Sequence, residues 1–103
     1  MSHTYYITCI QKNFPHETRI TQVGAFQYNQ ATNQLINFQY FSREQVVDLI
    51  LHHSNQFFTA TRLPNDTYQQ GQQVQVYQLE QEFFLKTIPN NIPGDNLGEL
   101  PNC

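Results

Sequence analysis

The segment FSREQVVDLILHH, residues 41–53, decides the fold class, because it combines a helix start signal with a helical apolar pattern. Ser42 can cap the first turn, and Gln45 three residues later can bond back to it, which makes a capping box. Four apolar residues then repeat at helical spacing and share one face: Val46, Val47, Ile50 and Leu51. The segment predicts one helix, over about residues 43 to 53, with this face packed on a sheet.

Strand-like segments lie on both sides of this helix. Residues 5–11 and 19–28 are rich in β-branched and aromatic side chains, and residues 35–40 fit a third strand or an extended approach to the helix. Three more such segments follow the helix, at residues 57–62, 73–79 and 83–87. This order predicts an α+β fold, in which one helix packs on one face of a mainly antiparallel sheet of four to six strands.

Finer features of the sheet follow from alternation and from turn residues. Strict alternation along the first strand puts Tyr5, Ile7 and Cys9 on one face and Tyr6, Thr8 and Ile10 on the other. In the second strand, Gly24 marks a bulge or a close approach of another chain segment. Connections are predicted at residues 29–33 and 64–66, at a glutamine-rich loop over residues 69–72, and at a tight link over residues 80–82.

The segment beyond the last predicted strand, residues 89–103, contains three prolines and two glycines, yet it keeps Leu97 and Leu100 three residues apart. That spacing predicts an ordered tail packed on the sheet. Asp95 or Asn96 is expected to cap a short helical turn that points both leucines into a hydrophobic site. We expect the leucines to pack against aromatic residues of the first and last strands, which brings Cys103 towards the sheet.

The pattern D-N-L-x-x-L-P-x-C of residues 95–103, together with Tyr6-Ile7-Thr8-Cys9-Ile10 and residues 19–24, resembles a small bacterial family known as a domain of unknown function. Members of that family look like single compact domains with a cysteine-bearing first strand, a second strand ending in glycine, one helix and a final strand. The resemblance does not extend to residues 27–40 and 68–82. It implies a fold and supplies no catalytic residues.

Length and charge bound the possible functions. The 103 residues are enough for one domain, residues 1–103, around a single core. The formal net charge of −3 disfavours nucleic-acid binding, because phosphate contacts need cations. Charged residues make up 13%, while there are 15 glutamines and 10 asparagines, so the surface is polar without being ionic. Two interpretations of the high glutamine and asparagine content stay open: compositional drift, or an amide-rich recognition surface.

The N-terminal segment carries no secretory signal pattern, since no cation precedes Lys12 and no apolar run follows the start. No segment approaches the roughly 20 apolar residues that span a bilayer. We therefore expect a cytoplasmic protein without a membrane partner, in which Cys9 and Cys103 stay reduced. A bridge between these two cysteines is expected only if the protein is exported by a route that the sequence does not show.

The spacing of potential ligands argues against a metal site. The sequence has no C-x-x-C or H-x-x-x-H pair, and His52 and His53 point about 100° apart on a helix. These two histidines are expected to interact with the negative end of the helix dipole. One alternative stays open, a metal site assembled from His3, Cys9, His16 and Cys103.

The sequence also gives little support for a catalytic site. Cys9 lies in mid-strand, where a cysteine is usually a small hydrophobic residue, and Glu80 and Glu82 lie on a predicted exposed turn. The four glycines form no phosphate-binding loop. We expect no enzyme, no cofactor, and no catalytic, cofactor-binding or metal-binding residues.

The aromatic residues point instead to binding. Three adjacent pairs, at residues 5–6, 57–58 and 83–84, must place one ring on each face of the sheet. One ring of each pair can lie under the helix. The opposite face is expected to be covered by tail residues, namely Ile92, Leu97 and Leu100, and any aromatic area left over would mark a protein-binding patch.

These observations favour a small non-enzymatic protein-binding domain, for which an inhibitor or immunity-type protein that occludes a toxin or enzyme is one form. The alternatives are a structural or regulatory subunit of a complex and a single-stranded nucleic-acid-binding module. A basic surface would favour the nucleic-acid alternative, and a pocket with convergent polar groups would favour an enzyme.

Overall fold

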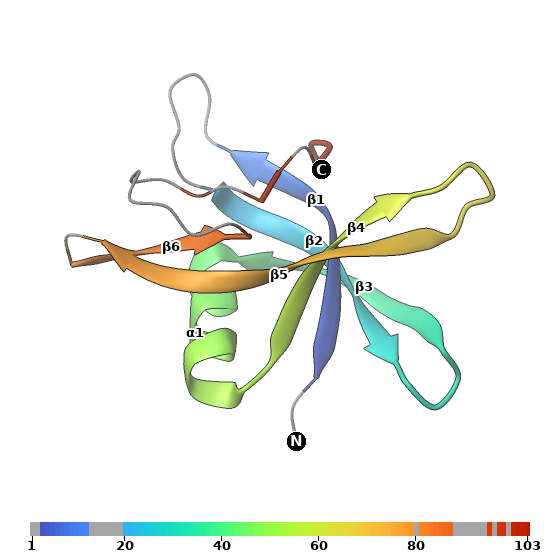
Figure 1. Cartoon of the computed structure of the whole chain (residues 1–103), viewed down its shortest axis with the longest axis horizontal. Coiled ribbons are helices and arrows are strands. Elements are labelled where there is room, and N and C mark those ends of the chain that lie inside the picture. The colour runs from blue at the N-terminus through green and yellow to red at the C-terminus, as the bar shows by residue number, and fades with distance from the viewer. Residues whose placement is uncertain (1–2, 13–19, 80, 88–94, 96, 99) are drawn as a thin grey trace.

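The computed structural model describes residues 3–12, 20–79, 81–87, 95, 97–98 and 100–103. Over these residues the chain forms a six-stranded sheet and one helix (Figure 1). The elements are, in chain order, β1 (Thr4–Lys12), β2 (Ile20–Asn29), β3 (Gln34–Ser42), α1 (Arg43–His53), β4 (Gln56–Arg62), β5 (Tyr68–Leu79) and β6 (Glu82–Lys86).

The helix is confirmed with the predicted start and end. The Ser42 side chain accepts a hydrogen bond from the Gln45 backbone N–H, and the Gln45 side chain accepts one from the Ser42 N–H, so both halves of the capping box are present. Ser54 ends the helix in a left-handed conformation with φ 56°. No helix within the described part of the chain is long and apolar enough to cross a membrane.

The sheet is mixed, with the strand order β3-β2-β1-β4-β5-β6. Four neighbouring pairs are antiparallel, but β1 and β4 at the centre are parallel. Parallel neighbours need a long crossover, and here β2, β3 and α1 lie between the two strands in sequence. The predicted sheet of four to six mainly antiparallel strands is therefore confirmed in outline, and the parallel central pair, which was not predicted, makes the sheet mixed.

A bulge in β1 changes which side chains share a face. The pairing with β2 shifts register between Ile7 and Cys9, so Thr8 is the extra residue. As a result Ile10 is buried in the core with Ile7, whereas Cys9 lines a hollow on the other side of the sheet. The prediction from strict alternation, with Ile7 and Cys9 on one face and Ile10 on the other, was wrong beyond this bulge.

Strand β5 begins at Tyr68, so it includes residues 69–72, which were predicted to be a loop before a strand that starts at residue 73. A register shift between β4 and β5 lies opposite residues 58–60 and absorbs the extra residue. Thr59 Oγ1 accepts a hydrogen bond from the Gln72 N–H at 3.1 Å, and a Cβ on Gly71 would collide with the same hydroxyl. The glutamine run is therefore strand with a glycine bulge, because only glycine fits beside Thr59.

The core lies between α1 and the sheet. From the helix Val46 is fully buried, and Val47, Leu49 and Ile50 pack around it. The sheet contributes the other buried apolar residues, among them Tyr5, Ile7, Val23, Phe57, Val74 and Leu85. Leu51, predicted to face the sheet, is instead 45% exposed, because it lies about 140° around the helix from Val46.

The tail is tied to the sheet by backbone, core and covalent contacts. Leu97 is buried in the core, and Leu100 packs against it. The Ile10 N–H donates to the Pro101 carbonyl at 3.0 Å, and the Cys103 N–H donates to the Ile10 carbonyl at 2.9 Å. The predicted approach of Cys103 to the sheet is thus confirmed.

Two expectations about the tail were wrong. Cys9 and Cys103 form a disulfide with their Cα atoms 5.0 Å apart, so the thiols are not free as predicted. Asp95 caps no helical turn, because its buried carboxylate is taken up by long-range bonds to the Ile20 N–H at 2.7 Å and the Leu85 N–H at 2.8 Å. The other predicted cap, Asn96, lies outside the described residues.

Candidate functional site

The face of the sheet opposite the helix carries a set of aromatic side chains. In the predicted pairs at residues 5–6 and 57–58, Tyr5 and Phe57 are buried in the core, while Tyr6 and Phe58 are partly exposed on the other face. We call this set the aromatic face; it consists of Tyr6, Phe26, Tyr28, Phe38, Tyr40, Phe58 and Tyr68. Phe38 and Tyr40, on the outermost strand β3, are 42% and 55% exposed.

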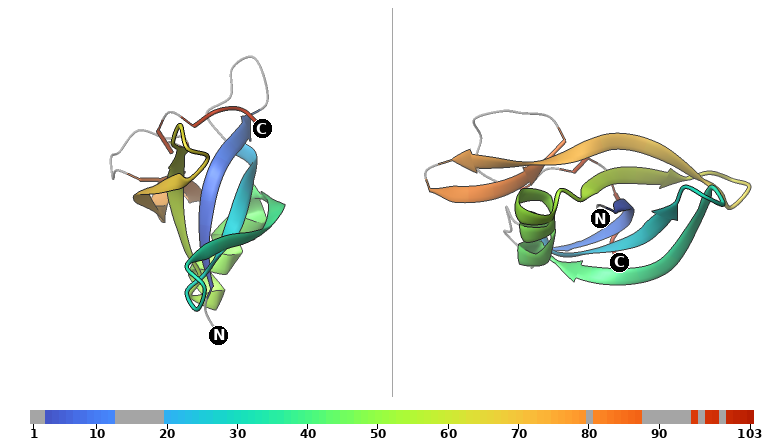
Figure 2. Two further views of the ribbon diagram at one scale, coloured as in Figure 1. Left: turned by 90° about the vertical axis from the view of Figure 1, so that its right-hand side faces the viewer. Right: turned by 90° about the horizontal axis from the view of Figure 1, so that it is seen from below.

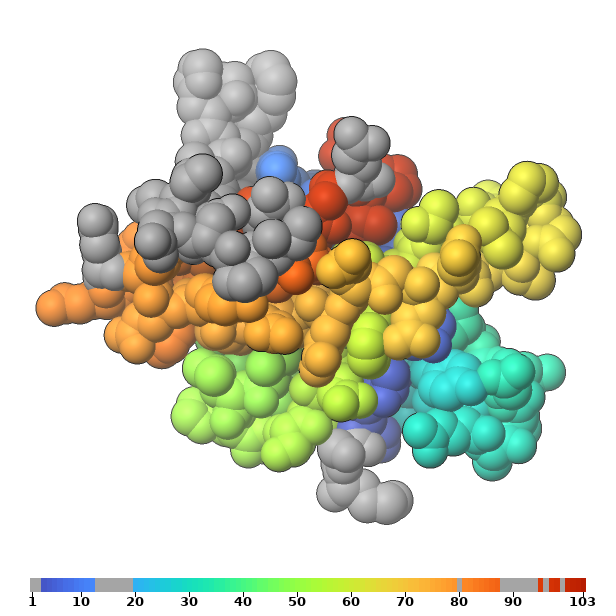
Figure 3. All heavy atoms as spheres, viewed as in Figure 1, coloured from blue at the N-terminus to red at the C-terminus, as the bar shows by residue number. Residues whose placement is uncertain are grey.

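The aromatic face is concave. Phe26 on β2 and Tyr68 on β5 have ring centroids 5.6 Å apart, although β1 and β4 lie between these strands in the sheet. The Tyr6 hydroxyl donates to Gln70 Oε1 across the same space. Figure 2 shows the cause, since the sheet curls and brings the β2–β3 and β4–β5 hairpins towards each other. The two hairpin ends stand apart as separate lobes of the surface (Figure 3).

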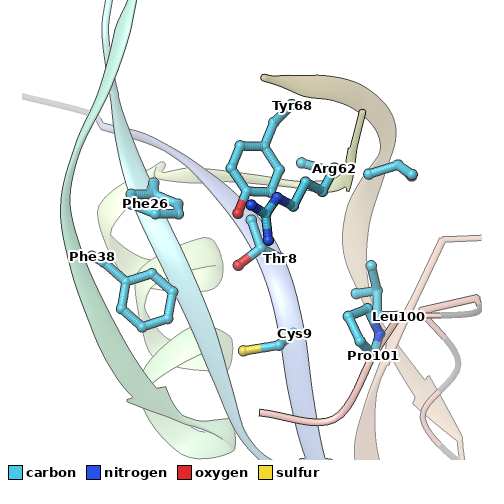
Figure 4. Close-up of a pocket in the computed structure, with 10 residues that line it drawn as sticks. Thr8, Cys9, Phe26, Phe38, Arg62, Tyr68, Leu100 and Pro101 are labelled. Carbon is cyan, nitrogen blue, oxygen red and sulfur yellow. The ribbon is translucent and has the colours of Figure 1, made fainter. Parts of the chain in front are cut away.

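Two hollows lie on this face and share Phe26 and Tyr68 in their walls. The first hollow, of about 430 Å³, lies near the tail and is lined by Thr8, Cys9, Phe26, Phe38, Ala60, Thr61, Arg62, Tyr68, Leu100 and Pro101. Figure 4 shows Phe26 and Phe38 on one wall and Leu100 and Pro101 on the other, with the Tyr68 hydroxyl between them.

The second hollow, of about 740 Å³, lies between the hairpin ends. Its floor is aromatic and its rim is uncharged except for one carboxylate; the lining residues are Tyr6, Phe26, Tyr28, Asn33, Gln34, Leu35, Asp66, Thr67, Tyr68 and Gln70. We call the two hollows together the aromatic groove. Their volumes fall in the range of ligand-binding clefts, and the two hollows adjoin at the side chains of Phe26 and Tyr68.

Local backbone features hold the rings in place. A Cβ on Gly24 would lie 2.5 Å from Cys9 Sγ and 2.7 Å from Phe38 Cζ, so glycine lets the ring and the disulfide lie directly on β2. In β3 the register shifts at Asn37, which has φ 55°. Asparagine tolerates this left-handed conformation better than most residues, and the bulge precedes Phe38.

The electrostatics of the aromatic groove are weak. Burial, with a smaller contribution from Tyr28, raises the pKa of the Tyr6 hydroxyl, so this group stays a neutral donor at physiological pH. Tyr6 and Tyr28 stack with their centroids 5.4 Å apart. Arg62, the cation of the groove, is paired with Asp66 in the next turn, and that hydrogen bond raises the pKa of Arg62. The groove thus offers stacking surfaces and neutral hydrogen-bonding groups.

The tail covers less of this face than predicted. Of the three residues expected to cover it, Leu97 lies in the core on the helix side, Leu100 reaches only the first hollow, and Ile92 lies outside the described residues. The aromatic residue pairs gave the correct signal for an exposed second face. No sequence signal identified the role of Tyr68, because its strand was predicted to begin only at residue 73.

The described residues that were considered for metal binding have other partners. The sulfur atoms of Cys9 and Cys103 are bonded to each other, and His3 Nδ1 lies 3.1 Å from Gln27 Nε2. His16 lies outside the described residues. Among the described side chains, no group of three or more His, Cys, Asp or Glu residues could hold a metal ion.

The two helix-end histidines lie where the sequence placed them. Both are in the last turn of α1, as expected for residues that interact with the helix dipole. His53 Nε2 also lies 3.3 Å from Asp48 Oδ2, and both side chains are more than half exposed.

Comparison with known proteins bears on the family and not on the activity. A search of curated proteins and a search of solved structures each gave no match. The family model described as "Protein of unknown function (DUF3892)" matches residues 6–101. This match spans β1 to the tail, including both hairpins of the aromatic groove and α1, and the chain therefore belongs to the DUF3892 family.

Proposed function

We propose that the protein is a non-enzymatic binding domain that holds a protein partner in the aromatic groove. The observation that carries the proposal is the exposed aromatic residues on the face that the helix does not cover, with Phe38 at 42% and Tyr40 at 55%. Exposed aromatic area of this kind is typical of interaction sites, in which tyrosine and phenylalanine are enriched and tyrosine is among the residues that contribute most to affinity.

The rim of the groove supports a polypeptide partner. Asn33, Gln34, Gln70 and Thr67 surround the rings with amides and a hydroxyl. Such groups can both donate to and accept from the backbone of an extended segment. Tyrosine combined with small amides is also the composition of antibody binding sites, which recognise protein surfaces without strong charge.

The alternative of single-stranded nucleic acid has weaker support. Aromatic rings can stack on bases, but phosphates need cations nearby. The chain has five Lys and Arg residues. Of the four that the structure describes, Arg43 and Arg62 are paired with Asp95 and Asp66, Lys86 is buried, and Lys12 is exposed at the end of β1.

In the form we favour, the domain acts by occlusion, as an inhibitor or immunity-type protein does when it covers the working surface of a toxin or enzyme. The groove is built on hydrogen-bonded strands, so it is preorganised, which lowers the entropic cost of binding. A structural or regulatory subunit would use the same surface and differ only in what the partner does.

The test is affinity capture with one variant on the aromatic face and one control variant on the helix. Wild-type protein, the double variant Phe38→Ser/Tyr40→Ser and the control Leu51→Ser are immobilised and exposed to extract from the native source. A specific partner should be held by the wild type and the control at moderate salt and lost from the double variant. Retention on all three proteins would refute the groove as the binding site.

Oligonucleotide binding provides the second arm of the test. Single-stranded RNA and DNA should bind weakly at physiological ionic strength. Tight binding that weakens steeply with added salt and disappears in the Phe38→Ser/Tyr40→Ser variant would replace the protein partner with a nucleic acid.

The disulfide bears on where this function operates. A persistent bond between Cys9 and Cys103 is typical of oxidising compartments, whereas the expected cytoplasmic location would keep the thiols reduced. We propose that the bond is formed in the working protein and that its compartment is oxidising. Alkylation of free thiols before extraction, followed by mass measurement, distinguishes the disulfide from the reduced cysteines. Full alkylation of both cysteines would contradict the oxidising compartment and favour the cytoplasmic location.

A further inference from the structure

A third hollow, separate from the two hollows of the aromatic groove, lies between α1 and β6. It has a volume of about 410 Å³, and Val47, Leu51 and Phe83 form its apolar part. Leu51 and Phe83 are 45% and 39% exposed. Val47 and Leu51 are four residues apart on the helix, so they stand one above the other and face Phe83 together.

The rim of this helix-side hollow is acidic. Glu44 and Asp48 come from α1 and Glu82 comes from β6. The cation of the lining, Arg43, is held by Asp95 through a 2.8 Å ion pair and also donates to the Phe83 carbonyl. Its charge is therefore offset from within the fold. His52 also lines the hollow and Asp48 lies 3.3 Å from His53 Nε2, but both side chains of that pair are more than half exposed, so the carboxylates of Glu44 and Asp48 set the sign of the field around the hollow.

The geometry of the helix explains why the apolar patch is exposed. The apolar pattern of α1 is wider than the strip that the sheet covers, because Val46 points into the core while Leu51 lies about 140° around the axis. Val47, between them, is only partly buried. Apolar side chains with acids one turn away on the same helix face are the complement of a segment with the opposite charge pattern.

We propose that this helix-side hollow docks a basic amphipathic segment of a partner protein. One bulky apolar side chain of the segment enters between Leu51 and Phe83, and lysines or arginines on either side of it face Glu44 and Asp48. This site is separate from the aromatic groove and does not depend on the function proposed for it.

A random peptide library displayed on phage is the probe for this site. The library is selected against the wild-type protein, and the enriched peptides are synthesised and measured by fluorescence anisotropy. The expected peptides carry one large apolar residue flanked by lysine or arginine, and their affinity should weaken as salt is raised. Enrichment of neutral or acidic peptides, or no enrichment, would overturn the proposal.

Matched variants locate the binding. Leu51→Asp should weaken the selected peptides about tenfold or more, because it removes an apolar contact. The control Tyr40→Ser alters an exposed residue of the aromatic face, on the other side of the sheet, and should leave the affinity unchanged. Equal binding to Leu51→Asp, or loss of binding in Tyr40→Ser, contradicts the assignment.

A second variant tests the same site with little risk of misfolding. Glu44→Gln/Asp48→Asn changes only exposed side chains, so the fold should be retained. It should lower the affinity several-fold at low salt and much less at high salt. An affinity that does not respond to the loss of these two charges would refute the role of the acidic rim.

Discussion

At the scale of single residues, Asp95 makes the most connections among the side chains of the described tail. Its carboxylate accepts from the Ile20 N–H of β2 and the Leu85 N–H of β6, and it is paired with Arg43 at the start of α1. The side chain of Asp95 has no exposed surface and that of Arg43 is 15% exposed. Water therefore cannot replace any of these bonds when the carboxylate is removed.

The substitution Asp95→Asn should lower the free energy of unfolding by about 3 to 5 kcal/mol, because it leaves a largely buried guanidinium unpaired and turns an amide N–H₂ towards a backbone donor. Urea denaturation measures the change. The matched control is Asp66→Asn, which breaks the pair with Arg62 on the surface and should have little effect. Equal losses in the two variants would show that burial does not set the strength of these pairs.

At the scale of elements, the tail is joined to β1 by both a disulfide and backbone hydrogen bonds. The disulfide links residues separated by 94 positions, so it closes nearly the whole chain into one loop. Cross-links over long loops restrict the unfolded chain most strongly. The hydrogen bonds between Ile10 and residues 101 and 103 do not depend on the disulfide and hold the tail in the same place.

The double variant Cys9→Ser/Cys103→Ser should therefore keep the fold and lose about 4.7 kcal/mol of stability by the chain-entropy estimate. Thermal unfolding of the wild type with and without reductant provides the control, since the reduced wild type should match the variant. A variant as stable as the oxidised wild type would show that the bond adds no stability. A variant that no longer folds would show that the hydrogen bonds alone do not hold the tail.

The elements that depend on neighbouring residues could be predicted from the sequence. The ends of α1 follow from Ser42 and Gln45 and from the apolar repeat, which involve only residues a few positions apart. The start of β5 was missed because glutamine has no strong strand signal and because the need for Gly71 arises from Thr59, on another strand. Asp95 was read as a local cap because its real partners are distant in sequence.

The aromatic face was predictable only in outline. Adjacent aromatic pairs show that some rings must lie opposite the helix, and Tyr6 and Phe58 do so. The contact of Phe26 with Tyr68 depends on the curl of the sheet and on bulges at Thr8 and Asn37, which no local pattern reveals. The helix-side hollow was missed because an apolar helix stripe was taken to be covered along its full width.

At the scale of the whole molecule, the sheet separates the buried core face from the partly exposed aromatic face, and two adjacent tyrosines lie on opposite sides of it. Burial raises the pKa of Tyr5 on the core face. Burial, and then the neighbouring Tyr28, raise the pKa of Tyr6 on the aromatic face. In both cases the folded protein favours the neutral phenol more than the unfolded chain does.

This difference predicts alkaline destabilisation. The folded pKa of each tyrosine lies above the unfolded value of about 10, so their contribution to stability is fully present below about pH 10 and is lost as the pH rises through the folded pKa. Denaturation at a series of alkaline pH values should show this fall, and Tyr6→Phe should reduce its slope. A stability that stays constant through this range, or a slope unchanged in Tyr6→Phe, would contradict the assignment.

The parallel pairing of β1 with β4 has a consequence for how the chain is made. The first strand cannot gain its central neighbour until residues 56–59 have left the ribosome, and the core cannot be completed until Asp95 and Leu97 have followed. Contacts so distant in sequence make folding slow, on the order of milliseconds to seconds. During synthesis the β2–β3 hairpin and α1 are therefore expected to form early, while Ile7 and Phe57 stay exposed until their last neighbours are made. A chaperone that shields apolar strands would act in this interval.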